Sequence, residues 1–280
     1  MSLKKLVNWG RALSLMLPLS DKQKVVIYYK IFTDFFEVIS EGSGLLNYGQ
    51  EALCLQTAET LPKKGDWLDV GCGIGGPARL LTSEYQDVNV TGINISDLQI
   101  NEGNRRTSEA GLSERVTIQK GDACKMPFDG DRFDALYAIE TAFHFPDKKA
   151  FASEAHRNIR KNGKFACADM VMAEDGVSKT DSFKSRLFHE WLGILNMNKV
   201  SNWQTDLTEA GFKNIAVEDV TQTVLVDGLT KANERIDKWR HKLKKDYPWL
   251  LIELVKWGNR WTITDLEKKP VRYVIITADA

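Results

Sequence analysis

A short run of one acidic residue and three glycines is the part of the sequence best suited to hold a ligand. Asp69 ends an apolar stretch, and the glycines follow at the spacing G-x-G-x-x-G, as Gly71, Gly73 and Gly76. Pro77 then opens an amphipathic segment, as is typical of the first turn of a helix. The run predicts a strand, a tight turn and a helix N-terminus at which the backbone can approach a nucleoside-bearing cofactor.

The glycine spacing also occurs in enzymes that bind nicotinamide dinucleotides, so it does not identify the cofactor by itself. In that class a carboxylate ends the second strand and binds the ribose, whereas this chain has Asn94 there. Asp69 suits a positively charged ligand better than a pyrophosphate. S-adenosyl-L-methionine carries an ammonium and a sulfonium and no phosphate, and these residues favour it.

His144 and Asp169 are the residues best placed for acid–base chemistry. His144 lies in the loop after a predicted strand, and Asp169 follows the apolar run Phe165-Ala166-Cys167-Ala168 of the next one. The carboxyl ends of parallel strands are where an open α/β sheet binds its ligands. Imidazole has a reference pKa of ~6.5, so His144 is a candidate general base. Asp169 is expected to hold the imidazole tautomer and to stabilise the imidazolium. The alternative is a buried, hydrogen-bonded histidine that only caps its loop.

The elements that must position these residues alternate between strand and helix. Apolar strands that alternate with helical patterns predict a parallel, doubly wound sheet. The predicted strands are 67–70, 88–93, 116–119, 133–138 and 165–171, and the helices between them are 77–84, 97–110 and 148–160.

Outside this region the pattern is mainly helical. Residues 1–60 and two late inserts carry apolar residues at helical spacing, and a capping box, Ser201-x-x-Gln204, opens a helix that stops at Gly211. Two further strands are predicted over 215–217 and 271–277.

Several motifs occur together in an order that resembles a known family. They are D-V-G-C-G-I-G-G over 69–76, Gly121-Asp122-Ala123, the strand 133–138 and the turn Asn162-Gly163-Lys164-Phe165. Across about 60–175 the chain resembles the class I S-adenosylmethionine-dependent small-molecule methyltransferases. The loop E-T-A-F-H-F-P-D over 140–147 resembles that of macrolide-sugar and other natural-product O-methyltransferases and of tocopherol and sterol C-methyltransferases.

This resemblance implies a fold and a division of the chain. The fold is α/β, a Rossmann-like, doubly wound, mostly parallel sheet of seven strands, the last one antiparallel, with helical lid inserts. The expected parts are an N-terminal helical segment over the cofactor (1–60), a cofactor-binding core (61–175), a helical lid insert (176–200), a continuation of the core (201–227), a second lid insert (228–265) and a final core strand (266–280).

The resemblance also implies roles for individual residues. His144 and Asp169 would be catalytic, with Asp169 beside the imidazole. Glu140, His189 and Trp191 are expected in the substrate pocket. S-adenosyl-L-methionine would be held by Asp69, Gly71, Gly73, Asn94, Ile95, Gln99, Asp122, Ala123 and Tyr48. Asn94 departs from the acidic residue that many relatives carry.

The leading hypothesis is methyl transfer to a hydroxyl of a small, lipophilic natural product, with a histidine base. Methylation of a prenyl, sterol or activated ring carbon is the main alternative, in which Glu140 would face a carbocation. A non-catalytic cofactor-binding module and a nicotinamide oxidoreductase are the remaining alternatives. No cluster of His, Asp and Glu has the spacing of a metal site.

Composition restricts the partners and the compartment. The 280 residues have a formal net charge of +0, which gives no reason to expect nucleic acid. The four cysteines form no C-x-x-C pair and are expected to be reduced in a cytoplasmic protein. No stretch is long enough to span a bilayer, and the oligomeric state is left open. The N-terminal amphipathic helix and the basic cluster 238–245 are expected at the surface, with a membrane surface as the less favoured use of each.

Overall fold

In the described part of the chain, seven strands form one sheet in the order β3-β2-β1-β4-β5-β7-β6. The computed structural model describes residues 3–14, 19–45, 49–174, 197–264 and 271–280. Only β7 runs antiparallel to its neighbours, as expected. The strands are β1 (Lys64–Val70), β2 (Asp87–Asn94), β3 (Val116–Lys120), β4 (Phe133–Ile139), β5 (Ile159–Met172), β6 (Lys213–Asp219) and β7 (Val271–Asp279).

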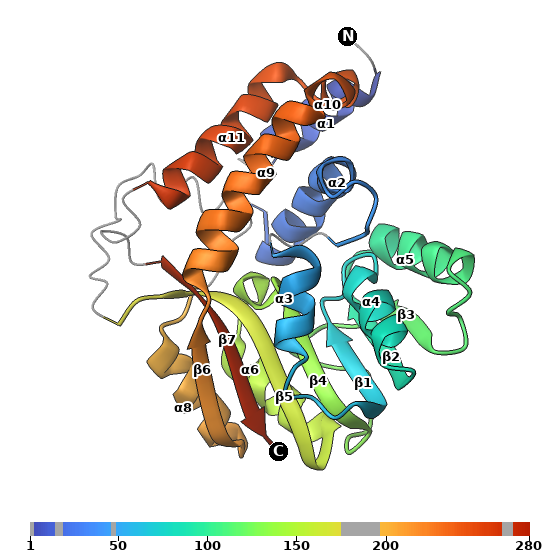
Figure 1. Cartoon of the computed structure of the whole chain (residues 1–280), viewed down its shortest axis with the longest axis vertical. Helices are drawn as coiled ribbons and strands as arrows, with labels where there is room; N and C mark the ends of the chain where they lie inside the picture. Colours follow the sequence, from blue (N-terminus) through green and yellow to red (C-terminus); the bar gives the residue numbers. More distant parts are fainter. Residues whose placement is uncertain (1–2, 15–18, 46–48, 175–196, 265–270) are drawn as a thin grey trace.

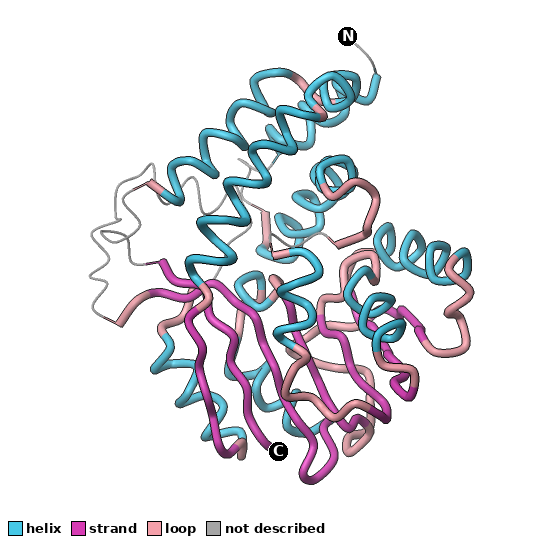
Figure 2. Tube along the Cα trace, in the orientation of Figure 1, coloured by secondary structure: helices cyan, strands magenta, loops and turns pink. Residues whose placement is uncertain are grey.

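Helices cover both faces of this sheet (Figures 1 and 2). One face packs against α3 (Gln50–Thr57), α4 (Gly76–Glu84) and α5 (Asp97–Glu109), and the other against α6 (Lys148–Asn158) and α8 (Val200–Ala210). Each face of the sheet has its own cluster of buried apolar side chains. Neighbouring residues of a strand belong to different clusters, because successive side chains point to opposite faces. Trp67 belongs to the first cluster and Leu68 to the second, and both are fully buried.

Five further helices form a cap beyond the carboxyl ends of the parallel strands (Figure 1). They are α1 (Leu3–Ser14), α2 (Asp21–Ile39), α9 (Asp227–Lys238), α10 (Arg240–Asp246) and α11 (Trp249–Ile263). Phe32 and Phe35 of α2 pack with Ile236 of α9 and with Leu251 and Ile252 of α11 in a third apolar cluster. Helices before the first strand and helices between β6 and β7 therefore build one cap with its own core.

The elements differ from the sequence prediction in two places. The predicted helix 148–160 ends earlier, and β5 begins at Ile159 instead of 165. Ile159 pairs with Phe133, and the chain then turns at Asn162, where φ is +66°. α8 begins at Val200 rather than after a cap at Ser201, so the predicted capping box is wrong. The backbone nitrogen and the hydroxyl of Ser201 instead donate to the Glu174 carboxylate at 2.7 and 2.8 Å. The helix ends at Gly211, as predicted, with a φ of +110°.

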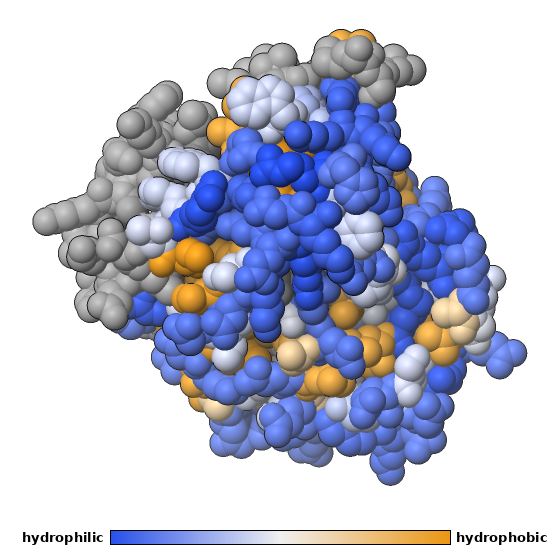
Figure 3. All heavy atoms as spheres, turned by 45° about the horizontal axis from the view of Figure 1, so that its top comes forward, coloured by the Kyte–Doolittle hydropathy of each residue, from blue (hydrophilic) through white to orange (hydrophobic). Residues whose placement is uncertain are grey.

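The surface of the cap side is mainly hydrophilic, and apolar residues reach it in separate patches (Figure 3). A search of the described helices finds none that is long and apolar enough to cross a bilayer. The four cysteines are free thiols, as expected.

Candidate functional site

The glycine turn after β1 lies where two chain segments approach its backbone closely. Gly71 has a φ of +74°, and a Cβ there would lie 2.0 Å from the Thr141 hydroxyl oxygen. A Cβ at Gly76 would lie 2.0 Å from the carbonyl oxygen of Gly44. Any larger residue would push away the loop after β4 or the segment before α3, so glycine is required at both positions.

Two adjoining cavities lie over this turn and beneath α2. They share Tyr29, Gly71 and Gly73 in their linings and contain about 660 Å³ and about 410 Å³ of empty space. The sheet order places them where β1 lies between β2 and β4, which is the point at which the order of strands reverses and ligands bind in such sheets. We call the two cavities together the cleft.

Eight of the nine predicted cofactor residues line the cleft. The ninth, Tyr48, lies outside the described residues. Residues at or after the ends of β2 and β3 line the larger cavity, and Asp69 near the end of β1 lines the smaller one. The eight are Asp69, Gly71, Gly73, Asn94, Ile95, Gln99, Asp122 and Ala123.

Asp69 is the buried charge of the cleft. Its side chain is 2% exposed, and its Oδ2 accepts no hydrogen bond. Burial raises the pKa of this carboxyl to about 7, and the nearby Tyr137 hydroxyl opposes the rise. A buried carboxylate oxygen that accepts no hydrogen bond costs free energy unless a cation or a donor reaches it. The site therefore favours a ligand that carries a positive charge.

Asn94 links the walls of the cleft. Its side-chain nitrogen donates to the Gly73 carbonyl at 3.2 Å and to Gln99 Oε1 at 2.9 Å. Gln99 in turn donates to the Thr33 hydroxyl of α2 at 3.1 Å. The glycine turn and the cap are thus joined through two amide side chains, and the hydrogen atoms of Asn94 are already engaged within the protein.

His144 lies in the cleft and contacts the cap. It ends a single 3-10 turn, Ala142–His144, in the loop after β4. Its Nε2 lies 2.9 Å from the hydroxyl of Tyr29 on α2. The two rings meet edge to face with centroids 5.4 Å apart. Tyr29 also lines both cavities, including the one that contains Asp69.

Asp169 has different partners from the one expected. Its Oδ2 pairs with Lys148 Nζ at 2.6 Å and accepts from the Trp203 indole nitrogen at 3.3 Å, whereas Oδ1 accepts no hydrogen bond. Both charged side chains are fully buried. Burial raises the pKa of the Asp169 carboxyl, and Lys148 opposes the rise. The carboxylate of Asp169 is thus paired with the ammonium at the start of α6, and neither this ammonium nor the Trp203 indole is the expected partner, the His144 imidazole.

Of the predicted substrate-pocket residues, Glu140 is in the cleft. It lines the smaller cavity and has a φ of +51°, and its backbone nitrogen donates to the Ala168 carbonyl. His189 and Trp191 lie outside the described residues. Within the described part of the chain, no group of three or more His, Cys, Asp or Glu side chains could hold a metal ion.

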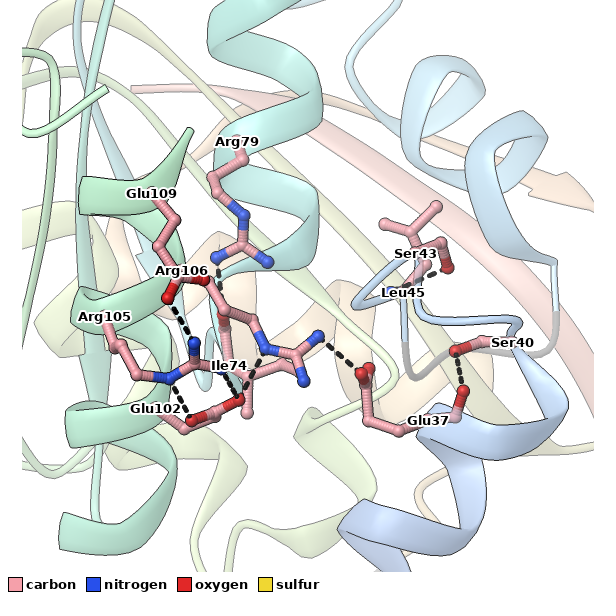
Figure 4. A network of polar contacts seen from close by, with 10 residues as sticks. All are labelled: Glu37, Ser40, Ser43, Leu45, Ile74, Arg79, Glu102, Arg105, Arg106 and Glu109. Atoms are coloured by element: carbon pink, nitrogen blue, oxygen red, sulfur yellow. Dashed lines mark hydrogen bonds and ion pairs between the residues drawn. The ribbon is translucent and has the colours of Figure 1, made fainter. Parts of the chain in front are cut away.

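A network of ion pairs fixes α2 to α5 at one side of the cleft (Figure 4). Arg106 of α5 pairs with Glu37 of α2 and with Glu102 of its own helix. Arg79 of α4 donates to the Ile74 carbonyl of the glycine turn at 2.7 Å. The Arg106–Glu37 pair holds the cap against α5, and Arg79 ties α4 to the glycine turn.

Sequence reasoning missed Tyr29 and Lys148. The helical spacing of apolar residues around Tyr29 predicts a helix, but it does not say which residues face the cleft. Lys148 precedes a second lysine and follows Asp147, which is typical of a solvated helix start. A buried lysine paired with a distant aspartate leaves no local signal.

Comparison with known proteins agrees with this geometry. Residues 68–167 match a family model described as a methyltransferase domain. A sterol 24-C-methyltransferase from Aspergillus fumigatus is 37% identical over 157 residues, which are 55% of this chain and 41% of that protein. A 27-O-demethylrifamycin SV methyltransferase from Amycolatopsis mediterranei is 32% identical over 176 residues, 62% of this chain and 63% of that protein.

A solved structure resembles most of the fold. A Haemonchus contortus phosphoethanolamine N-methyltransferase 2 in complex with S-adenosyl-L-methionine superposes with a TM-score of 0.76 at 20% identity, over 93% of this chain and 57% of that one. The matches cover less than two thirds of either curated relative, at 41% and 63% of their lengths.

Proposed function

We propose that the protein transfers a methyl group to a hydroxyl oxygen of a small, lipophilic molecule, because residues 68–167 match a family model described as a methyltransferase domain. The proposed methyl donor is S-adenosyl-L-methionine, which when bound supplies a methyl group activated by a positively charged sulfur. The observation that carries the proposal is the contact between His144 and Tyr29 inside a cleft that also contains the buried carboxylate of Asp69.

The residues of the cleft fit this donor. Asp69 offers a buried carboxylate oxygen without a hydrogen-bond partner to a ligand that carries an ammonium and a sulfonium. Gly71 lines both cavities, so a ligand in the cleft can contact the backbone of the glycine turn. Asp122 and Ala123 line the larger cavity, where we place the adenine, with the ribose beside Asn94 and Ile95.

The chain's own residues would position the acceptor and remove its proton. A sulfonium is already a good leaving group, so alignment and exclusion of water are the main contributions that a protein can make. An aliphatic hydroxyl is a weak nucleophile and must lose its proton as the new carbon–oxygen bond forms. We assign that proton to His144 Nε2, which receives it through the hydroxyl of Tyr29. The acceptor oxygen then lies next to Tyr29, between the two cavities.

Replacement of His144 tests this assignment. We expect His144→Ala to slow methylation of an aliphatic hydroxyl by ~100 to 10,000-fold, which is the usual contribution of a positioned base. Tyr29→Phe should reduce it to a similar degree, because the route of the proton is lost. A phenol has a reference pKa of ~10 and should depend less on both residues. The measurement is transfer of a labelled methyl group to matched alcohol and phenol acceptors.

A matched control is His241→Ala, which changes an exposed histidine of α10 and should leave transfer unchanged. Unaltered transfer to the alcohol in folded His144→Ala protein would refute the assigned base.

Methylation of carbon is the second candidate, and Glu140 favours it. Glu140 lines the smaller cavity together with Asp69 and Tyr29, so acidic residues and an aromatic ring are available to stabilise a carbocation formed from an alkene. The similarity to a sterol 24-C-methyltransferase supports the same reaction. Assays with hydroxylated natural products, sterols and prenyl diphosphates, followed by location of the label on oxygen or carbon, separate the two. Glu140→Gln should impair transfer to carbon and spare transfer to oxygen.

A further inference from the structure

Two helices that are far apart in the sequence expose apolar side chains on the outer side of the cap. Leu6 of α1 is 49% exposed, and Val7 beside it is also exposed. On α11, Trp249 is 65% and Leu254 41% exposed, and Leu250 and Trp257 are exposed as well. These six residues, together with the exposed basic residues of α10, are called the cap surface below.

α11 has an exposed apolar side opposite its buried one. Leu251 and Ile252 point into the core of the cap and are buried. Leu250, Leu254 and Trp257 follow one another at spacings of four and three residues, which places them on a single different face of the helix. A surface helix of a globular protein normally has charged residues on that face. An apolar second face instead marks a surface that contacts something apolar.

The helices of the cap surface lie together in the fold. Lys4 Nζ of α1 pairs with the Asp246 carboxylate at the end of α10 at 3.1 Å, and Asn8 donates to the Asp246 carbonyl at 3.1 Å. α11 begins three residues later. Figure 1 shows all three helices at the end of the molecule most distant from the sheet.

The cap surface is strongly basic although the whole chain is neutral. α1, α10 and α11 carry nine basic and two acidic side chains, in a chain with 38 of each kind. Asp246 pairs with Lys4 and Glu253 with Arg240. Two acidic side chains of neighbouring helices also pair with this set, Asp34 with Lys4 and Asp237 with Arg240 and the buried Lys256. Nine basic side chains thus face four acidic ones. Lys242, Lys244 and Arg260 are exposed. The surface therefore combines apolar side chains with an excess of positive charge.

We infer that the cap surface binds the face of an anionic phospholipid membrane. Exposed tryptophans and leucines insert at the boundary between headgroups and acyl chains, and flanking lysines are attracted by the negative surface potential. A second copy of this chain is a poorer occupant. A two-fold contact would bring the same lysines of both copies together, and like charges facing each other across an interface are unfavourable.

The inference does not depend on the proposed reaction, because the cap surface shares no residue with the lining of the cleft. It would, however, place the cap and its Tyr29 next to a membrane. A lipophilic acceptor could then approach from the bilayer.

Sedimentation of the full chain with vesicles tests the inference. We expect the protein to bind vesicles made of equal parts phosphatidylcholine and phosphatidylglycerol, to bind pure phosphatidylcholine at least tenfold more weakly, and to lose binding as salt is added, since salt screens exposed charges. Trp249→Ser with Leu254→Ser should weaken binding to the mixed vesicles by roughly tenfold or more. Lys242→Glu with Lys244→Glu should have a similar effect, because each basic residue near the surface contributes about 1 kcal/mol.

Matched controls lie elsewhere on the molecule. Leu98→Ser changes a leucine of α5 that is 46% exposed and lies outside the cap. Lys64→Glu with Lys161→Glu reverses two exposed lysines in β1 and β5, the latter near the turn at Asn162. Neither control should alter binding, and circular dichroism should show the same fold for all variants.

Two results would overturn the inference. One is equal binding of the cap-surface variants and the wild type to mixed vesicles, or no binding by the wild type. The other is a wild type that dimerises in sedimentation velocity, without binding vesicles, and becomes monomeric in the Trp249→Ser, Leu254→Ser variant. That result would assign the surface to a second copy.

Discussion

Asp69 is the residue whose environment restricts the ligand most, because it favours a positively charged one. Burial raises its pKa to about 7, so near neutral pH it is close to the point where it gains or loses its proton. A ligand ammonium beside it would favour the ionised form. Affinity for such a ligand must therefore depend on the protonation of this one group.

We predict that S-adenosylhomocysteine, which retains the ammonium, binds more tightly as pH rises toward 7. Below that value each added pH unit should strengthen binding by up to about tenfold, since the proton on Asp69 must leave first. Above it the affinity should level off. Calorimetric titration from about pH 5.5 to about pH 8.5 measures this. Asp69→Asn should bind more weakly and show a flat profile, and a persisting slope in that variant would assign the pH dependence to another group.

The same residue should affect the stability of the ligand-free protein. The pKa of Asp69 is higher in the folded than in the unfolded chain, so the folded state binds the proton more tightly. The stabilisation from that proton is complete below about pH 4 and is lost as pH rises through about 7. Asp69→Asn should consequently be more stable than the wild type at pH 8 and not at pH 4. A carboxyl group that lowers the stability of the ligand-free protein in this way serves ligand binding and does not stabilise the fold.

The loop between β4 and α6 is the element that depends most on a single buried interaction. It carries His144, and its far end is fixed by Lys148, whose ammonium is buried against Asp169 of β5 and lies 5.0 Å from the centre of the Trp203 ring. Two buried charges cost free energy to desolvate, and removal of either partner leaves the other uncompensated.

We predict that Lys148→Met lowers the free energy of unfolding by about 3–5 kcal/mol, as does loss of one partner of other buried pairs. The double variant Lys148→Met, Asp169→Leu should recover most of that loss, because neither charge remains. Denaturant titration measures both. Methyl transfer should stay impaired in the stable double variant, because the end of the loop next to α6 has lost its attachment to Asp169 of β5, although Glu140 at its start still bonds to Ala168. Full transfer there would show that the pair serves stability alone.

The whole molecule consists of a sheet with two apolar faces and a cap with its own core, and the cleft lies between them. Tyr29, Thr33 and Glu37 of α2 contact the loop after β4, Gln99 and Arg106, respectively. A ligand in the cleft would contact the sheet side and the cap at once. Its binding energy should stabilise both parts.

We predict that S-adenosylhomocysteine at a hundred times its dissociation constant adds about 2.7 kcal/mol to the free energy of unfolding. For a chain of this size that corresponds to a rise of roughly 5–10 °C in Tm. Differential scanning fluorimetry with and without the compound measures it, with NAD as the comparison compound. A rise with NAD and none with S-adenosylhomocysteine would contradict the proposed cofactor.

The sequence by itself determined the core of this protein. Strand alternation predicts the parallel sheet, and the ends of β1, β2 and β3 carry Asp69, Asn94 and Asp122, which line one cleft in the structure. This works because parallel strands bring their carboxyl ends to the same edge. A motif that follows a strand is therefore placed by the topology alone.

Only the tertiary structure decided which groups His144 and Asp169 contact. The sequence predicted that His144 and Asp169 contact each other. In the structure the imidazole contacts the Tyr29 hydroxyl, and the carboxylate pairs with Lys148. Tyr29 is 115 residues from His144 in the chain, and Lys148 is 21 residues from Asp169. Contacts of this kind depend on how a helix packs over the sheet and on which polar groups are buried together. The local pattern of residues predicts neither the packing nor the burial.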